Sequence, residues 1–177
     1  MPSLYTFASY SPDWPAEFER EAQRLKALLG DVLVTIHHIG STSVPGLAAK
    51  PIIDLLPLVR DIFELESCTP VLQAAGYHAW GEYGLPGRRY FTKDHGAYRT
   101  HNVHIYQVDD PDVDRHLAFC AYLRFHPQAR QEYEDLKRRV FQLHPADIGA
   151  YNGGKNEWIK RIEPVALAWY NQQKLDH

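Results

Sequence analysis

The chain has 177 residues, a formal net charge of −3 and 45% hydrophobic residues. This length is enough for one domain with a sizeable core, and we expect residues 1–177 to form a single domain. The small negative charge gives no strong signal for binding nucleic acid or an anionic membrane. With two cysteines the chain has neither a disulfide framework nor a zinc motif.

Two further observations concern location. No apolar run approaches the ~20 residues that a membrane span needs. The first residues, MPSLYTFASYSPDW, lack a basic segment followed by an apolar core, so we expect no secretion signal. Together with the low cysteine content, these features favour a protein of the reduced cytoplasm that does not bind membranes.

Hydrophobic periodicity divides the first two thirds of the chain into helices and strands. Apolar residues at helical spacing predict a helix over 12–29, ended by Gly30. A second helical segment, 61–75, contains Pro70 and should break there. The remaining apolar segments have the pattern of strands and lie at 32–39, 51–59, 77–80, 88–92 and 103–108.

Beyond Pro111 the pattern is helical. Asp112 is placed to cap a first helix, Pro127 to start a second, and a last one begins near Gly154, with Pro164 expected to kink or split it. The last three predicted strands have few helical residues between them, which favours antiparallel pairing there. We therefore predict an α+β fold: a mixed sheet of about five strands, helices packed on one face, and a helical C-terminal half.

The stretch 34–59, VTIHHIGSTSVPGLAAKPIIDLLPLV, contains a turn suited to an anion. Gly40 lets the backbone approach a ligand, and hydroxyl groups beside exposed N–H groups attract phosphate. The predicted phosphate-binding residues of this stretch are Gly40, Ser41, Thr42, Ser43 and Lys50. The same hydroxyls could instead cap the short helix that follows, and Lys50 could be solvated.

Asp54 stands inside an otherwise apolar strand. A buried carboxylate is costly without a cation or hydrogen-bond partner. Asp54 is therefore the leading candidate for a metal ligand and catalytic residue.

The segment HIGSTSVPGLAAKPIID at 38–54 resembles the signature of the GrpB-like family (UPF0157), a branch of the DNA polymerase β-like nucleotidyltransferase superfamily. The resemblance continues through most of the chain, in RRYFTK at 88–93, HNVHIY at 101–106, AYLRFHPQARQEYEDLK at 121–137 and YNGGKNEWI at 151–159. It implies a nucleotidyltransferase-like fold and a site for a nucleotide or another phosphorylated small molecule.

The resemblance also implies a divalent metal ion. In that superfamily two acids at positions i and i+2 of a strand share one face and bind Mg²⁺. Here Asp54 has the first position but Leu56 has the second, so the pair is broken. The strand that usually adds a third acid has His104 instead. A site of Asp54, His104 and His38 follows; its imidazoles favour zinc, and magnesium or manganese stay open. His104 could equally be a partly buried strand histidine.

Basic residues offer further phosphate ligands. Arg88 and Arg89 alternate faces, so at most one can point into the pocket. Spacing and resemblance favour Arg89. Arg124, Lys137 and Lys155 match basic positions of the family's C-terminal motifs and could close over a polyphosphate, or form surface salt bridges.

The leading interpretation is a nucleotidyltransferase-like protein that binds a nucleotide or phosphorylated small molecule, with metal-dependent nucleotidyl transfer as its possible activity. Two alternatives stay open: a non-catalytic phosphate-binding module, and a metal-dependent phosphohydrolase that uses Asp54 and His104. Whether the chain is an enzyme is open as well. Because the acid pair is incomplete, we expect ordinary two-magnesium nucleotidyl transfer to be absent.

Overall fold

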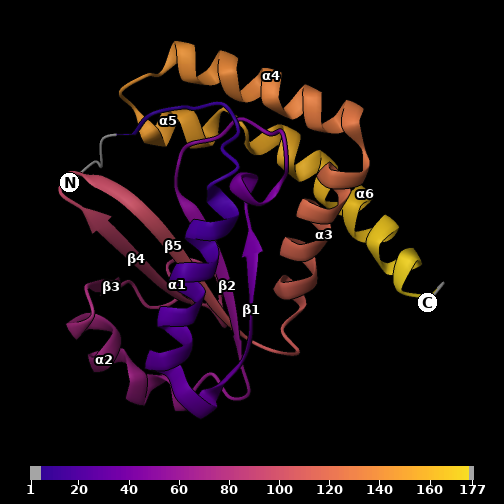
Figure 1. Cartoon of the computed structure of the whole chain (residues 1–177). Coiled ribbons are helices and arrows are strands. Elements are labelled where there is room, and N and C mark those ends of the chain that lie inside the picture. Colours follow the sequence, from indigo (N-terminus) through magenta and orange to yellow (C-terminus); the bar gives the residue numbers. More distant parts are fainter. Residues whose placement is uncertain (1–4, 176–177) are drawn as a thin grey trace.

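The computed structural model describes residues 5–175, and within them a mixed five-stranded sheet forms the centre of the molecule (Figure 1). The strand order is β1-β2-β5-β4-β3. The β2 and β5 strands are parallel, and every other neighbouring pair is antiparallel. The strands are β1 (Leu33–Ile39), β2 (Ile53–Val59), β3 (Tyr77–Ala79), β4 (Arg89–His95) and β5 (Tyr98–Gln107).

The helices are α1 (Trp14–Leu29), α2 (Thr69–Ala74), α3 (Pro111–Phe125), α4 (Pro127–Leu143), α5 (Ile148–Gly153) and α6 (Asn156–Leu175). Three 3₁₀ segments lie between these elements along the chain: η1 (Gly30–Val32), η2 (Ser41–Ser43) and η3 (Glu64–Cys68). The α+β class, the mixed sheet and the helical C-terminal half are as predicted. None of the described helices combines the length and apolarity that crossing a membrane requires.

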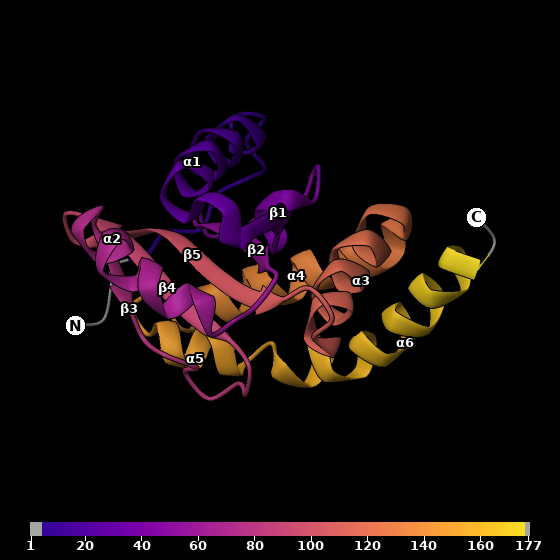
Figure 2. The same cartoon turned by 90° about the horizontal axis from the view of Figure 1, so that it is seen from below.

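Helices cover both faces of the sheet, so the expectation of helices on one face was wrong (Figure 2). Neighbouring residues of β2 show the division. Leu55 belongs to a core cluster with Trp14 and Leu25 of α1. Leu56 belongs to a second cluster, with Cys120 of α3 and Tyr133 of α4. The apolar run of β2 is therefore buried on both sides, as a central strand requires.

Some boundaries differ from the sequence-based expectations. The first C-terminal helix is capped by Asp110, whose Oδ1 accepts the N–H of Asp112 at 2.9 Å; Asp112 itself is not the cap. Pro164 lies inside α6. The short helix α5 was not predicted. The segment 61–75 does divide next to Pro70, into η3 and α2.

Candidate active site

The turn that follows β1 is built on Gly40, which has a φ of +71°. The N–H of Ser43 donates to Gly40 O at 3.1 Å, and the N–H of Val44 donates to Ser41 O at 3.2 Å. The N–H groups of Ser41 and Thr42 take no part in these two bonds. A glycine is favoured here because other residues adopt a positive φ only with strain.

A second constraint on Gly40 comes from Asp54. Ile39 and Asp54 are paired in the β1–β2 register, so the turn begins beside this carboxylate. A Cβ atom at Gly40 would collide with Asp54 Oδ2 and lie 3.0 Å from Asp54 Cβ and Cγ. The glycine therefore lets the backbone of the turn lie directly against the acid.

Asp54 takes part in a polar network with the next strand. Its Oδ1 accepts a 2.9 Å hydrogen bond from Asn102 Nδ2 and lies 3.5 Å from His104 Nε2. Burial raises the pKa of Asp54, but the hydrogen bonds with His104 and Asn102 and the charge of Lys50 outweigh burial, so the pKa is lowered overall. Asp54 is therefore a carboxylate at neutral pH. Asp54 and His104 thus share one face of neighbouring strands, as predicted.

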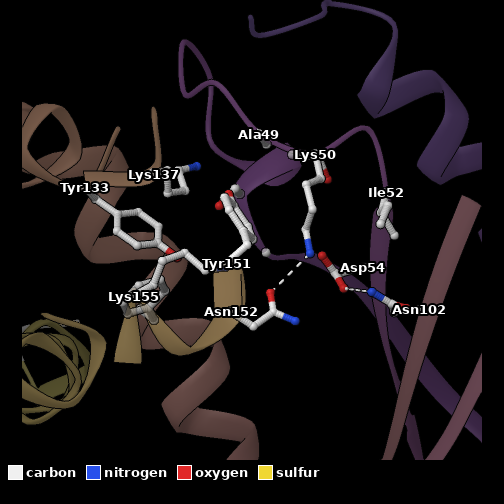
Figure 3. Close-up of a pocket in the computed structure, with 14 residues that line it drawn as sticks. Ala49, Lys50, Ile52, Asp54, Asn102, Tyr133, Lys137, Tyr151, Asn152 and Lys155 are labelled. Carbon is white, nitrogen blue, oxygen red and sulfur yellow. Dashed lines mark hydrogen bonds between the residues drawn. The ribbon is translucent and has the colours of Figure 1, made fainter. Parts of the chain in front are cut away.

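The carboxylate and the turn lie at one side of a cavity of about 270 Å³ between the sheet and the C-terminal helices (Figure 3). Its wall combines the turn, the segment before β2, the polar end of β5, and residues from three helical segments. The lining residues are Gly40, Ser41, Thr42, Ala49, Lys50, Ile52, Asp54, Asn102, Phe119, Tyr133, Lys137, Tyr151, Asn152 and Lys155.

Three lysines line this cavity from distant parts of the sequence. The Lys50 Nζ donates to Asn152 Oδ1 at 3.2 Å and lies 5.0 Å from the Tyr151 ring centroid. The Lys155 Nζ also lies over the Tyr151 ring, 4.4 Å from its centroid. Lys137 is 1% exposed and donates to Ala48 O. Figure 3 shows Lys50 pointing toward Asp54 and Asn152.

Within this group the charge of Lys50 disfavours the charged form of Lys155, and both disfavour the charged form of Lys137. Burial and the charge of Lys50 lower the pKa of Lys155 to about 7. Burial, followed by the charge of Lys155, lowers the pKa of Lys137. Burial lowers the pKa of Lys50 too, although Asp54 counteracts it. An anion that entered the cavity would relieve this repulsion, because it favours the protonated form of each amine.

Lys137 also positions the segment that leads to Lys50. The Ala48 N–H donates to Glu134 Oε2 at 2.9 Å, and the Ala48 carbonyl accepts from Lys137. The N–H and the carbonyl of Ala48 are thus both hydrogen-bonded to side chains of α4. This leaves Lys50 and Lys155 as the lysines with an amine free of a backbone partner among the described contacts.

The structure corrects the choice between the two arginines. Arg89 donates from Nε to Glu66 Oε1 at 2.8 Å and pairs in register with Ile105, whose side chain lies in the α1-side core. It does not line the cavity. Arg88 is the one on the Asp54 face: its Nη1 lies 3.4 Å from His104 Nδ1. The strand parity was recognised, but the sequence did not reveal which face carries the cavity.

His38 is also separated from the predicted site. It pairs in register with Leu55, on the α1 face, and its ring stacks on Phe18 with centroids 4.7 Å apart. Its Nε2 lies 2.9 Å from Thr42 Oγ1, so His38 supports the turn through a hydrogen bond to Thr42. Burial lowers the pKa of His38 to about 4, which keeps it neutral.

The remaining predicted ligands divide between lining and supporting roles. Ser41, Thr42 and Lys50 line the cavity. The Ser43 hydroxyl instead donates to Gly40 O at 2.7 Å. Arg124 bonds to Ser43 O at 3.1 Å and to Ser43 Oγ at 3.0 Å, so it braces the turn.

The donor set fits one shared cation better than two metals. Within residues 5–175, no three side chains of His, Cys, Asp and Glu gather as a metal site. Leu56, at the position of the second acid, is fully buried in the core. Asp54 and the nearby His104 remain, and a cation bound there would need oxygen atoms from the ligand, as Mg²⁺ takes from phosphates.

Sequence reasoning missed several lining residues. Tyr133 and Tyr151 are buried and form the aromatic wall beside the lysines. Asn152 supplies the acceptor for Lys50. Their signal was present in the motif YNGGKNEWI, which marked the segment but could not show that it packs against the turn after β1.

The sequence comparison gives the family. The model described as "GrpB protein" matches residues 5–164. The chain belongs to the GrpB family. The UPF0157 protein YqkA of Bacillus subtilis is 46% identical over 160 residues, which are 90% of this chain and 46% of YqkA. A dephospho-CoA kinase of Mycolicibacterium paratuberculosis is 31% identical over 182 residues, which cover 89% of this chain and 45% of that protein. The chain thus spans about half the length of these two relatives.

Solved structures agree with this fold. The crystal structure of the conserved protein GrpB from Enterococcus faecalis has a TM-score of 0.89 and 45% identity, and the match covers 93% of this chain and 99% of that one. The structure of Cid1 in complex with its short product ApU has a TM-score of 0.52 and 12% identity, covering 83% of this chain and 48% of that one. The second match shows a nucleotidyltransferase-like fold in this GrpB-family chain.

Proposed function

We propose that this GrpB-family chain binds the phosphate groups of a nucleotide or another phosphorylated small molecule in the cavity beside Gly40. The observation that carries the proposal is that Lys50 and Lys155 line the same cavity as the Ser41–Thr42 turn. Burial lowers the pKa of both amines, and the charge of Lys50 lowers the pKa of Lys155 further, so an anion beside them is favoured. Backbone N–H groups near serine hydroxyls add directional bonds. The likeness to Cid1 supports a phosphorylated ligand only at the level of the fold.

In this proposal each residue has a defined role. The turn at Gly40–Thr42 donates hydrogen bonds to phosphate oxygens, and the lysines neutralise their charge. Asp54, together with phosphate oxygens of the ligand, would bind a divalent cation, which would lower the charge repulsion between the phosphates and the carboxylate. Asn102 and His104 orient the carboxylate through the contacts described above.

The proposal does not include ordinary two-magnesium nucleotidyl transfer. That chemistry places two ions on shared carboxylates, so that the attacking and leaving oxygens are both stabilised. Leu56 stands in place of one of those carboxylates. Glu82, an acid in the turn before β4, accepts a hydrogen bond from the Gly87 N–H at 2.8 Å. We expect no robust magnesium-dependent release of pyrophosphate from ATP. Release that Asp54→Asn abolishes would contradict this expectation.

Calorimetric titration with inorganic pyrophosphate and with ATP tests the binding itself. A charge-assisted hydrogen bond contributes about 1.5–3 kcal/mol, so Lys50→Met should weaken pyrophosphate binding by about tenfold or more. Lys160→Met is the matched control, because Lys160 is exposed on α6 and does not line the cavity. Absence of binding by the unaltered protein, or equal affinities in the Lys50 and Lys160 variants, would refute the proposal.

A further inference from the structure

Beyond the lysine cavity, three aromatic side chains extend from the Asp54 network along the same face of the sheet. Tyr90 donates from its hydroxyl to Asn102 Oδ1 at 2.9 Å, and Asn102 bonds to Asp54. The Tyr83 ring stacks on Tyr90, with centroids 5.2 Å apart and planes 20° apart. The Trp80 ring follows, 5.8 Å from Tyr83. We name the three residues Trp80, Tyr83 and Tyr90 the aromatic platform.

The strand register places the platform on the cavity side. Tyr90 pairs with His104, and Thr92 pairs with Asn102. The Trp80 indole donates to Thr92 Oγ1 at 2.8 Å, which fixes the indole at this face. Tyr83 is 63% exposed and Trp80 is 49% exposed. Because one face of Tyr83 lies on Tyr90, its exposed area includes the opposite face of the ring.

The backbone that carries the platform is strained and braced. Tyr83 has a φ of +46°, an unusual value for a residue other than glycine. Buried Arg88 donates from Nη2 to Tyr83 O at 2.8 Å and from Nε to Glu82 O at 3.2 Å. A strained conformation that persists at such a cost points to function when a specific outlier is observed. Here the result is that the exposed ring is held in place before any ligand binds.

Positive charge accompanies the aromatic rings. The Arg88 guanidinium lies 4.8 Å from the Tyr90 ring centroid. Arg99 donates from Nη1 to Asn102 Oδ1 at 3.4 Å, the same oxygen that accepts from the Tyr90 hydroxyl. Exposed aromatic faces beside arginines favour a ligand with a planar ring and a negative charge, as nucleotides have.

We propose that the aromatic platform is a nucleobase subsite, in which the base of a nucleoside stacks on Tyr83 beside the proposed phosphate site. The proposal deepens the proposed function, since it assigns a nucleoside to the neighbourhood of Asp54. The two can fail separately, because the platform and the lysine cavity share no residue. A free nucleoside reports on the platform, and inorganic pyrophosphate reports on the cavity.

The test follows the Trp80 indole N–H by nuclear magnetic resonance, with that signal assigned by its loss in Trp80→Phe. Adenosine, guanosine, cytidine and uridine are titrated with and without saturating pyrophosphate. At least one nucleoside should shift the Trp80 signal in both conditions. Stacking of a base on one aromatic ring contributes binding free energy that Tyr83→Ala removes, so this variant should weaken the binding of that nucleoside by about tenfold. Tyr83→Phe keeps the ring and should retain the affinity.

Controls separate binding from folding. Phe63→Ala removes a ring that is 74% exposed near the α1-side core and should leave the nucleoside affinity unchanged. Tyr83→Gly, which accepts a positive φ, replaces Tyr83→Ala if the latter does not fold. The pyrophosphate affinity should be the same in all these variants. The proposal is overturned if no nucleoside shifts the Trp80 signal, or if the Tyr83→Ala and Tyr83→Gly proteins bind it as the unaltered protein does.

Discussion

The backbone of Gly40 lies so close to the carboxylate of Asp54 that no side chain fits between them. This contact joins the first strand of the sheet to its second at the cavity, across the β1–β2 register. It explains why a glycine and an aspartate fourteen positions apart depend on each other. Replacement of either residue should therefore affect the other.

Gly40→Ala should destabilise the protein more than Gly46→Ala. Both glycines have a positive φ, +71° and +80°, but a Cβ at Gly46 would meet nothing within 4 Å. The strain alone should cost about 1–3 kcal/mol in either variant, and Gly40, with a ψ of −177°, lies in a region that is essentially restricted to glycine. The collision with Asp54 should add about 1–3 kcal/mol for Gly40→Ala. Urea denaturation measures both. Adding Asp54→Ala should reduce the extra cost, and equal losses in the two glycine variants would contradict the contact.

Lys155→Met should stabilise the unliganded protein at pH 7. The pKa of Lys155 is about 7 in the folded protein, below its ordinary value of 10.5. The unfolded chain therefore binds more protons between about pH 7 and 10.5, and the stability of the unaltered protein rises with pH across that window. Lys155→Met should lose this rise and gain at least about 1 kcal/mol at pH 7, or roughly 2–4 °C in Tm. Lys160→Met should change neither quantity, and a Lys155→Met protein that melts lower would refute the prediction.

The same amine should make pyrophosphate binding dependent on pH. Above pH 7 the free protein loses the Lys155 proton, and an anionic ligand must restore it. The affinity should therefore fall as pH rises above 7, by up to about tenfold per pH unit. Calorimetry in buffers of different ionisation enthalpy should detect proton uptake on binding. Lys155→Met corrects for the ionisation of pyrophosphate itself; an unchanged slope in that variant would assign the dependence to another group.

Asp54→Asn should reverse the effect of magnesium on pyrophosphate binding. In the unaltered protein Mg²⁺ should strengthen binding, because a cation held by Asp54 would offset the negative charges of the carboxylate and the pyrophosphate. Without metal, Asp54→Asn should bind pyrophosphate more tightly by about 1 kcal/mol, since a like charge is removed, and Mg²⁺ should no longer help. Titrations with and without a chelator measure this, with zinc and manganese as further arms. Asp109→Asn is the control, because Asp109 bonds to Gln107 and does not line the cavity. A magnesium effect that survives Asp54→Asn would place the cation elsewhere.

Local sequence patterns were sufficient for the sheet and for the first half of the site. The positive φ of Gly40 and the position of Asp54 on the next strand follow from short-range spacing. The faces of His38 and Arg89 do not, because they depend on which side of the sheet the C-terminal helices cover. A one-residue change of parity moves a side chain to the opposite face, so a long-range packing choice decides these assignments.

Long-range contacts also account for what was left open, such as the position of Lys155, and for what was missed, such as Tyr83 and Trp80. Lys155 approaches Lys50 only because α5 and α6 pack beside the segment before β2, more than a hundred residues away. Tyr83 lies in the segment 81–87, whose glycines and proline indicated only a turn, and Trp80 was predicted as the last residue of a strand over 77–80. Only the strand register, which places Tyr90 on the Asp54 face, shows that the rings of Trp80 and Tyr83 lie beside Tyr90 and the candidate site.

The two bonds from α4 to Ala48 have a consequence for folding. Glu134 and Lys137 are separated from Ala48 by 86 and 89 residues, so the segment carrying Lys50 receives its final position only when the C-terminal helices dock. Contacts of such sequence separation require a large loop to close and tend to slow folding. The proposed anion site therefore forms only in the fully folded chain, and phosphate should stabilise that docked arrangement relative to partly folded states.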